Sequence, residues 1–219
     1  MAIIFQDGFE TLPFTGLIHC PPWTATFGTP TVVAAPVHHG SYSAYFDNRW
    51  DYCRKTIVGQ TTVFARAYYY LTQLPAANQF MEIMRFRGGG ATIMSARIRY
   101  DLGVLQVGFR RYVPGILDVY TNFNWLINTW YCLEMNFVKH AITGHHELWV
   151  NEIQRAVNAG VNTSGAADVD TVDIGVTDAY ENLPMNADCV VIADARIYCE
   201  VPFGGGLNPA QMCKVILGL

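Results

Sequence analysis

Three alternating runs of residues in the middle of the chain constrain its fold more than any other feature. The runs are Gln79–Arg87, Thr92–Tyr100 and Val104–Arg111, and two glycine-containing segments, Gly88–Gly90 and Asp101–Gly103, separate them. Apolar and polar residues that alternate with a period of two are the pattern of a strand with one buried face. Asp-Leu-Gly suits a tight hairpin turn, because glycine readily adopts positive φ. The sequence therefore predicts an antiparallel meander with one apolar face and one face that carries arginines.

The alternation also predicts which side chains share a face. Arg97 and Arg99 of the second run lie opposite the apolar side chains, as do Gln106 and Arg110 of the third. The first run is less regular, because strict alternation places the acidic Glu82 on the same side as apolar residues. The simplest interpretation of the arginines is a solvated sheet surface with cross-strand ion pairs.

The rest of the chain continues as short strands separated by turns. About a dozen strands with turns roughly every eight to twelve residues are typical of a β-sandwich or barrel. The chain has 219 residues, of which 51% are hydrophobic, so it can form one large core. We expect an all-β antiparallel sandwich as a single domain over residues 1–200. The strands expected outside the meander are Ile3–Phe5, Thr31–Ala35, Tyr42–Phe46, Thr61–Leu71, Ile116–Tyr120, Trp130–Val138, His146–Val150, Val169–Val176 and Cys189–Cys199.

A helix is expected only at the end of the chain. Asn208 is a suitable N-cap, and Pro209 suits the first helical position. Residues 201–219 are thus predicted to form a glycine-rich join at Gly204–Gly206 and a short helix. Because that helix is apolar on one side, we expect it to dock on the domain or on a neighbouring chain.

Charge and composition exclude several classes of partner. The formal net charge is −4, which argues against a general nucleic-acid-binding protein. No apolar run approaches the ~20 residues of a membrane-spanning helix. The first residues lack the basic and long apolar regions of a signal peptide. The protein therefore stays in the cell that makes it, leaves by lysis or particle assembly, or has lost a leader. We favour a virion or extracellular surface, and homo-oligomers are compatible with the sequence.

The six cysteines do not form a known motif. None lies in a CxxC pair, so a zinc ribbon or a thioredoxin motif is not expected. Cys132 lies in an apolar strand and is interpreted as a core thiol. Cys189 and Cys199 lie at opposite ends of one expected strand, too far apart to bond each other. Pairing of Cys20 or Cys53 with another loop cysteine stays open.

The histidines include two adjacent pairs, His38-His39 and His145-His146. Neighbouring residues of a strand point to opposite faces, and the sequence contains no HxH or HExxH spacing. A catalytic zinc site with three protein ligands is therefore not expected. These histidines are interpreted as residues of hairpin turns.

Three segments carry a resemblance to a known superfamily. They are the opening Phe5–Glu10, the hairpin from Trp130 to Asn151, and the closing Val191–Tyr198. Their order and spacing resemble the concanavalin A-like lectin/glucanase (laminin-G-like) jelly rolls, of the kind also found in phage structural proteins. The resemblance covers about residues 1–200. It implies a jelly-roll sandwich that binds carbohydrate or forms part of a phage-like particle.

The resemblance also implies a structural cation site. In many such jelly rolls an aspartate of the last strand meets backbone carbonyls near the first strand and near a later glycine. The matching positions are Asp194, Gly8 and Gly40. Carboxylate and carbonyl oxygens suit Ca²⁺. The alternative is that Asp194 only caps a turn or pairs with an arginine.

The spacing of the glutamates indicates whether the chain could be a glycoside hydrolase. Retaining glycoside hydrolysis needs two carboxyl groups about 5–5.5 Å apart, which this superfamily supplies in an ExDxxE strand. Glu82 stands alone with Met84 at the alternate position, and Glu134 has Asn136 there, so hydrolysis is not expected. A polysaccharide lyase stays open as the alternative. However, the arginine-glutamate-arginine (RxExR) and glutamine-histidine (QxH) strand patterns of alginate lyases are absent from the sequence.

The preferred prediction is a non-catalytic module that binds glycans or serves as a structural part of a particle. Sugars present apolar C–H faces and hydroxyl edges, which aromatic rings and planar hydrogen-bonding groups recognise. Arginines would favour acidic glycans through paired hydrogen bonds. The candidate ligand-binding residues on the arginine face of the meander are Arg97, Arg99, Tyr100, Gln106, Arg110 and Tyr112.

Overall fold

The computed structural model describes residues 1–10, 16–17 and 23–199, and within these ranges the chain is entirely β. Sixteen strands form two antiparallel sheets of nine and seven strands. The expectation of an all-β antiparallel sandwich is confirmed. The described residues contain no helix that could span a membrane. The predicted C-terminal helix of residues 201–219 lies outside the described residues.

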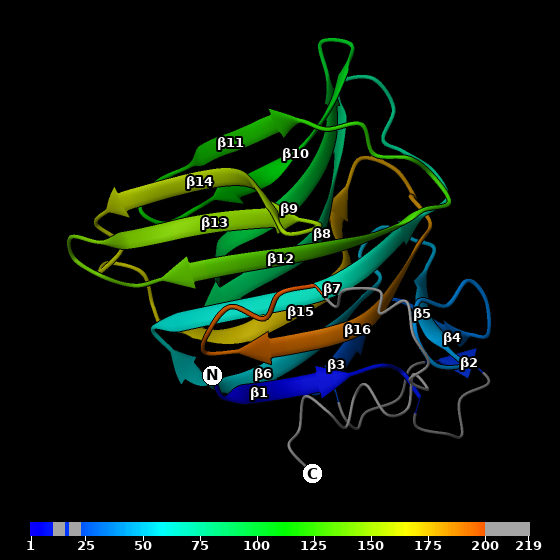
Figure 1. Cartoon of the computed structure of the whole chain (residues 1–219), viewed down its shortest axis with the longest axis horizontal. Helices are drawn as coiled ribbons and strands as arrows, with labels where there is room; N and C mark the ends of the chain where they lie inside the picture. Colours follow the sequence, from blue (N-terminus) through cyan, green and yellow to red (C-terminus); the bar gives the residue numbers. More distant parts are fainter. Residues whose placement is uncertain (11–15, 18–22, 200–219) are drawn as a thin grey trace.

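The nine-stranded sheet has the order β14-β13-β12-β7-β16-β5-β4-β2, and β1 also pairs with β16. Figure 1 shows β12, β7, β16 and β1 side by side in front, with the strands of the other sheet curving behind them. The strands are β1 (Ile3–Asp7), β2 (Gly16–Leu17), β4 (Thr31–Val33), β5 (Ser43–Phe46), β7 (Thr62–Leu71), β12 (Trp130–Val138), β13 (Gly144–Val150), β14 (Ile153–Val161) and β16 (Met185–Ala193).

The seven-stranded sheet has the order β11-β10-β9-β8-β15-β6-β3. Its centre is the predicted meander, in which β8, β9 and β10 pair in sequence order. The strands are β3 (Ala25–Phe27), β6 (Tyr52–Gln60), β8 (Gln79–Gly88), β9 (Ala91–Asp101), β10 (Val104–Arg111), β11 (Leu117–Asn122) and β15 (Val169–Ala179).

A β-bulge explains why the first run of the meander alternates irregularly. Glu82 pairs with Arg97 of β9, whereas Met84 pairs with Ala96, so Ile83 is an extra residue on β8. The expectation that Glu82 shares a face with Met84 is therefore wrong. Met84 points into the core between the sheets, and Glu82 lies on the outer side.

The last predicted strand is also corrected. The strand begins at Met185 and ends at Ala193 instead of running from Cys189 to Cys199. Its first half was hidden in the sequence because Asn186 and Asp188 are polar, although both are buried. The Nδ2 of Asn186 donates a hydrogen bond to Ser43 Oγ there, at 3.1 Å. Four further strands, β2, β3, β6 and β14, were not predicted.

One disulfide contradicts the interpretation of Cys132 as a free core thiol. Cys132 of β12 is bonded to Cys199, which follows β16, and the two Cα atoms are 6.0 Å apart. The bond forms because β16 has already ended, so the chain beyond Ala193 can turn back toward β12. The link closes a loop of sequence separation 67.

Candidate functional site

Strand register aligns polar side chains in rows across the outer side of the seven-stranded sheet, here called the polar face. Directly paired residues on neighbouring strands share a face. The first row contains Arg54, Asp173, Arg85, Ser95, Arg110 and Asp118. The second contains Asp178, Glu82, Arg97, Gly108 and Tyr120. The third contains Phe80, Arg99, Gln106 and Asn122.

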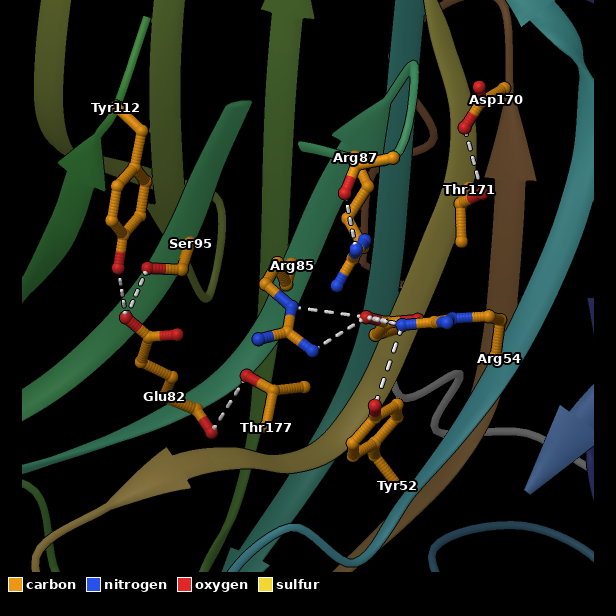
Figure 2. A network of polar contacts seen from close by, with 12 residues as sticks. Tyr52, Arg54, Glu82, Arg85, Arg87, Ser95, Tyr112, Asp170, Thr171 and Thr177 are labelled. Carbon is orange, nitrogen blue, oxygen red and sulfur yellow. Dashed lines mark hydrogen bonds and ion pairs between the residues drawn. The ribbon is translucent and has the colours of Figure 1, made fainter. Parts of the chain in front are cut away.

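Glu82 is the centre of a buried polar cluster in the middle of this face. Its Oε1 accepts hydrogen bonds from Arg97 Nε at 2.7 Å, Ser95 Oγ at 2.8 Å and the Tyr112 hydroxyl at 2.8 Å. Figure 2 shows Glu82, Ser95 and Tyr112 pointing toward one another. Arg97 also donates from Nη2 to the Tyr112 oxygen, at 2.9 Å. The carboxylate is thus satisfied by three residues, which offsets the cost of burying its charge.

Burial changes the proton affinities in this cluster. It raises the pKa of Tyr112, and the negative charge of Glu82 raises it further. Burial also raises the pKa of Tyr120, to about 12. Burial alone would lower the pKa of Arg97, but the adjacent Glu82 raises it overall. At neutral pH both tyrosines are protonated and Arg97 is charged.

The Arg99 pocket lies beside this cluster and has a volume of about 210 Å³. The guanidinium of Arg99 lies 3.7 Å from the centroid of the Tyr120 ring, and its Nε donates to Gln106 Oε1 at 2.7 Å. Arg99 also pairs with Asp101, and Arg110 pairs with Asp118. The lining residues are Asn78, Gln79, Phe80, Arg97, Arg99, Tyr100, Asp101, Arg110, Tyr120 and Tyr180.

A second cluster forms around Asp173, toward the β6 edge of the polar face. Its fully buried carboxylate accepts hydrogen bonds from Arg54 Nε at 2.7 Å and from Arg85 Nε at 3.0 Å. Figure 2 shows Arg54 and Arg85 pointing toward each other from β6 and β8. Because one aspartate is shared by two arginines, this cluster carries an excess of positive charge.

The Trp50 cleft opens next to the Asp173 cluster and has a volume of about 490 Å³. Trp50 is 53% exposed, and the Arg49 guanidinium lies 4.2 Å from the centroid of its ring. Arg87 donates to the neutral carbonyl of Gly90, and no carboxylate among the described residues pairs with it. The described residues that line the cleft include three arginines and no carboxylate: Phe27, Gly28, Arg49, Trp50, Tyr52, Arg85, Arg87 and Thr177.

The turn that carries Arg49 and Trp50 is firmly held. The carboxylate of Asp51 accepts hydrogen bonds from the backbone N–H groups of Asn48 at 3.1 Å and Thr29 at 2.9 Å. Asp51 is 1% exposed. A buried acceptor bonded to two backbone donors fixes the local chain, so the Trp50 ring is presented on an ordered support.

The structure brings the predicted ligand-binding residues together in one connected network. Arg97, Arg99, Tyr100 and Arg110 line the Arg99 pocket. Gln106 and Tyr112 do not line it, but each is hydrogen-bonded to an arginine that does. Arg97 is only 3% exposed and is paired with Glu82. Within this set, Arg99 and Arg110 are therefore better placed than Arg97 to contact a ligand.

Sequence reasoning missed most of the Trp50 cleft. None of the cleft residues Phe27, Arg49, Trp50, Arg85 and Arg87 is among the predicted ligand-binding residues. One signal was present, because Asp47-Asn48 is a turn sequence that places a large aromatic residue between polar ones. The positive φ of Trp50, 69°, could not be predicted from the sequence.

The three residues implied as calcium ligands do not fit a shared ion. Antiparallel register pairs Ile3 with Ala193 and Asp7 with Val190, so Asp194 lies beside the start of β1. Its Oδ1 accepts a hydrogen bond from the Ala2 N–H group at 2.6 Å. Gly8 follows the opposite end of β1, about 20 Å away at the rise of an extended strand.

Gly40, the third of these residues, lies against Glu10 instead of Asp194. A Cβ built on Gly40 would lie 2.2 Å from Glu10 Oε1, and the same carboxylate accepts the Ser41 N–H group at 2.9 Å. Asp194, Gly8 and Gly40 are therefore not placed to share one calcium ion.

Comparison with known proteins gives structural matches only. No family model matches the chain, and no curated protein matches its sequence. Cellulose induced protein Cip1 is 16% identical with a TM-score of 0.58, and the match covers 90% of this chain and 100% of that one. The endo-β-1,4-glucuronan lyase from the fungus Trichoderma reesei is 13% identical with a TM-score of 0.62, covering 89% and 96%.

A third match is the ligand binding domain of botulinum neurotoxin serotype D in complex with N-acetylneuraminic acid. It is 8% identical with a TM-score of 0.54, and the match covers 87% of this chain and 46% of that one. At such identities these likenesses show the fold alone. They agree with the antiparallel β-sandwich that the sequence predicts.

Proposed function

We propose that the polar face binds acidic glycan chains without cleaving them, and that the Trp50 cleft is its main site. The observation that carries this proposal is the lining of the cleft, which combines an exposed aromatic ring with three arginines and no carboxylate among the described residues. An aromatic ring packs against the C–H face of a sugar. A guanidinium binds a carboxylate through two parallel hydrogen bonds.

Arg87 is the strongest candidate for the carboxylate contact. Arg85 is engaged by Asp173, and Arg49 is paired with Asp178 at 3.2 Å. Arg87 donates only to the Gly90 carbonyl, so its positive charge is not neutralised by the described residues around it. A uronate or sialate carboxylate would supply the missing negative charge.

The Arg99 pocket supports an extended ligand over the same face. Both pockets are lined by residues of β8, Arg85 in the Trp50 cleft and Phe80 in the Arg99 pocket. A polysaccharide chain that crosses β8 would contact both pockets. Affinity should then rise with the length of the oligomer.

The titratable groups favour binding over cleavage. A lyase needs a base that removes a proton next to the uronate carboxyl group. Tyr112 is hydrogen-bonded to Glu82 and has a raised pKa, so it is a poor base near neutral pH. For hydrolysis, Glu82 and Glu134 lie on different sheets and cannot act as a pair.

A place on a phage-like particle stays a prediction. Neither the contacts of the described residues nor the similar structures bear on it. A glycan-binding face would serve a particle surface and a free protein equally well.

The test is calorimetric titration of the purified full chain with uronic acid oligomers and with neutral glucose oligomers of matched length. We expect saturable binding of the acidic series that weakens with added salt. Trp50→Ala and Arg87→Ala should each weaken binding by about tenfold or more. Lys139→Ala removes a charge from the segment after β12, which lines neither pocket, and is the matched control.

Two outcomes would contradict the proposal. Equal affinity for neutral and acidic oligomers would remove the role of the arginines. Release of unsaturated sugar products during incubation, seen by ultraviolet absorbance, would support the lyase alternative instead.

A further inference from the structure

Two histidines and a cysteine meet on the nine-stranded sheet, away from the polar face. His38 and His39 lie in the turn before β5, and Cys189 lies in β16. One ligand atom from each, two imidazole nitrogens and the sulfur, lie within 4.8 Å of one another. The sequence separates the pair from the cysteine by about 150 residues, so no spacing motif could reveal the cluster.

His38 and His39 lie in a turn, so their side chains can point in the same direction. Adjacent side chains of a strand point to opposite faces, but residues 38 and 39 are not in a strand. Their Nδ1 atoms are 2.5 Å apart. Two imidazole nitrogens that face each other in this way can share a proton or bind the same cation.

Backbone geometry places the cysteine against this pair. The pairing of β16 with β7 shifts between Asp188 and Val191, and Cys189 lies in that irregular stretch. Cys189 has a φ of 49°, which non-glycine residues rarely adopt. Such outliers cluster at functional sites.

One buried carboxylate organises the backbone of all three residues. Asp188 Oδ2 accepts the N–H groups of His38 and His39, each at 3.0 Å. Its Oδ1 accepts the N–H group of Cys189 at 2.7 Å. This one carboxylate therefore fixes the backbone of the three residues relative to one another.

Aromatic rings also fix the orientation of one imidazole. The His38 ring stacks on Tyr68 with centroids 3.6 Å apart, and Trp130 meets its edge at 5.5 Å. The stacking limits rotation of the His38 ring. One ligand is thus positioned before any ion binds.

We propose that His38, His39 and Cys189 bind a thiophilic divalent transition metal, with Zn²⁺ as the preferred ion. Two imidazole nitrogens and a thiolate form a ligand set that Zn²⁺ favours over Ca²⁺ and Mg²⁺. Tetrahedral Zn²⁺ with Zn–N bonds of ~2.0–2.1 Å and a Zn–S bond of ~2.3 Å places its ligand atoms about 3.3–3.6 Å apart. Small side-chain movements reach this geometry from the present one. Binding releases the thiol proton of Cys189 and leaves a fourth position for water or another ligand.

The experiment uses the full chain, treated with a chelator and handled under oxygen-free nitrogen without a reductant so that the Cys132–Cys199 bond stays intact, and titrated with Co²⁺ and then with Zn²⁺. Co²⁺ reports the site by its visible ligand-field bands and by a near-ultraviolet band from cobalt–thiolate charge transfer. We expect one equivalent to bind, Zn²⁺ to displace it, and the melting temperature to rise with the metal.

His39→Ala and Cys189→Ser should each abolish the stoichiometric binding, and Cys189→Ser should also remove the thiolate band. His145→Ala changes a histidine of β13 and is the matched control, with binding unchanged. His39→Ala keeps the test decisive if Cys189→Ser does not fold. Binding that survives in both variants, or a cobalt spectrum without a thiolate band, would overturn the proposal.

Discussion

Glu82 and Arg97 form an ion pair on the outer side of the seven-stranded sheet, yet they are only 1% and 3% exposed. The Arg97 guanidinium lies 4.1 Å from the centroid of the Phe80 ring, and the Tyr112 hydroxyl bonds to both partners. The polar face therefore contains charged side chains that are shielded from solvent, although they lie outside the core between the two sheets. A buried pair of this kind orders the side chains around it only while both members are present.

Glu82→Gln should destabilise the protein strongly, because it leaves the buried charge of Arg97 without a partner. The expected loss in the free energy of unfolding is about 3–5 kcal/mol. The double variant Glu82→Leu/Arg97→Leu should lose less than the single one, because it buries no charge. Urea denaturation measures both.

The more exposed pair of Arg110 and Asp118 provides the control for this prediction. Both side chains are 29% exposed, so Asp118→Asn should cost about 1 kcal/mol or less. Equal losses for Glu82→Gln and Asp118→Asn would show that burial of the first pair does not matter.

Gly108→Ala should open the contact between β10 and β11. A Cβ at this position would lie 2.0 Å from the Val119 carbonyl oxygen and 2.7 Å from Tyr120 Cδ1. Because the nearer atom belongs to the backbone, relief requires a shift of β11, and we expect a loss of about 1–3 kcal/mol in urea denaturation. At Gly165 a Cβ would meet nothing within 4 Å, so Gly165→Ala should change stability by less than about 0.5 kcal/mol.

The strands of the meander could be predicted because their side chains alternate, whereas the site depends on departures from alternation. The extra residue Ile83 changes which side chains of β8 face outward and so brings Glu82 beside Arg97 on the outer side of the sheet. Backbone outliers at Trp50 and Cys189 position the cleft and the proposed metal ligands. Single-sequence patterns do not encode such bulges, since a bulge depends on the partner strand.

Buried polar residues made the first half of β16 unrecognisable as a strand in the sequence. Asn186 and Asp188 occupy buried positions in β16, where Asn186 Nδ2 donates to Ser43 Oγ and Asp188 Oδ1 accepts the Cys189 N–H group. Asparagine and aspartate are typical of loops, and the sequence does not show the hydrogen-bond partners that allow them to lie in a buried strand. Because β16 ends at Ala193, the chain after it can return to β12 and bring Cys199 to Cys132, which a strand extended to Cys199 does not predict.

Cys199→Ser should destabilise the protein by removing the link to Cys132. In the chain-entropy description, a closed loop of sequence separation 67 is worth about 4 kcal/mol through its effect on the unfolded state. Thermal and urea denaturation under non-reducing conditions measure the loss. Peptide mapping of the unreduced wild type should show the bonded pair, and an unchanged midpoint in the variant would contradict the role of the bond.

His146 should make the protein sensitive to mild acid. Burial and then the positive charge of Arg111 lower its pKa to about 4 in the folded chain. The unfolded chain binds the proton at about pH 6.5, so between these values only the unfolded state is protonated. Stability due to the neutral ring is full above about pH 6.5 and falls as the pH drops toward 4, by about 3 kcal/mol in total.

The His146→Leu variant isolates this contribution from other groups that titrate in the same range. The ring packs against Phe109 and Phe137, with centroids 6.0 and 5.3 Å away, so leucine can replace it in an apolar environment. We expect the stability difference between His146→Leu and the wild type to shift in favour of the variant as the pH falls. His145→Leu, at the partly exposed neighbouring position, should follow the wild type. Parallel pH profiles for the wild type and His146→Leu would show that the buried imidazole is not the acid-sensitive group.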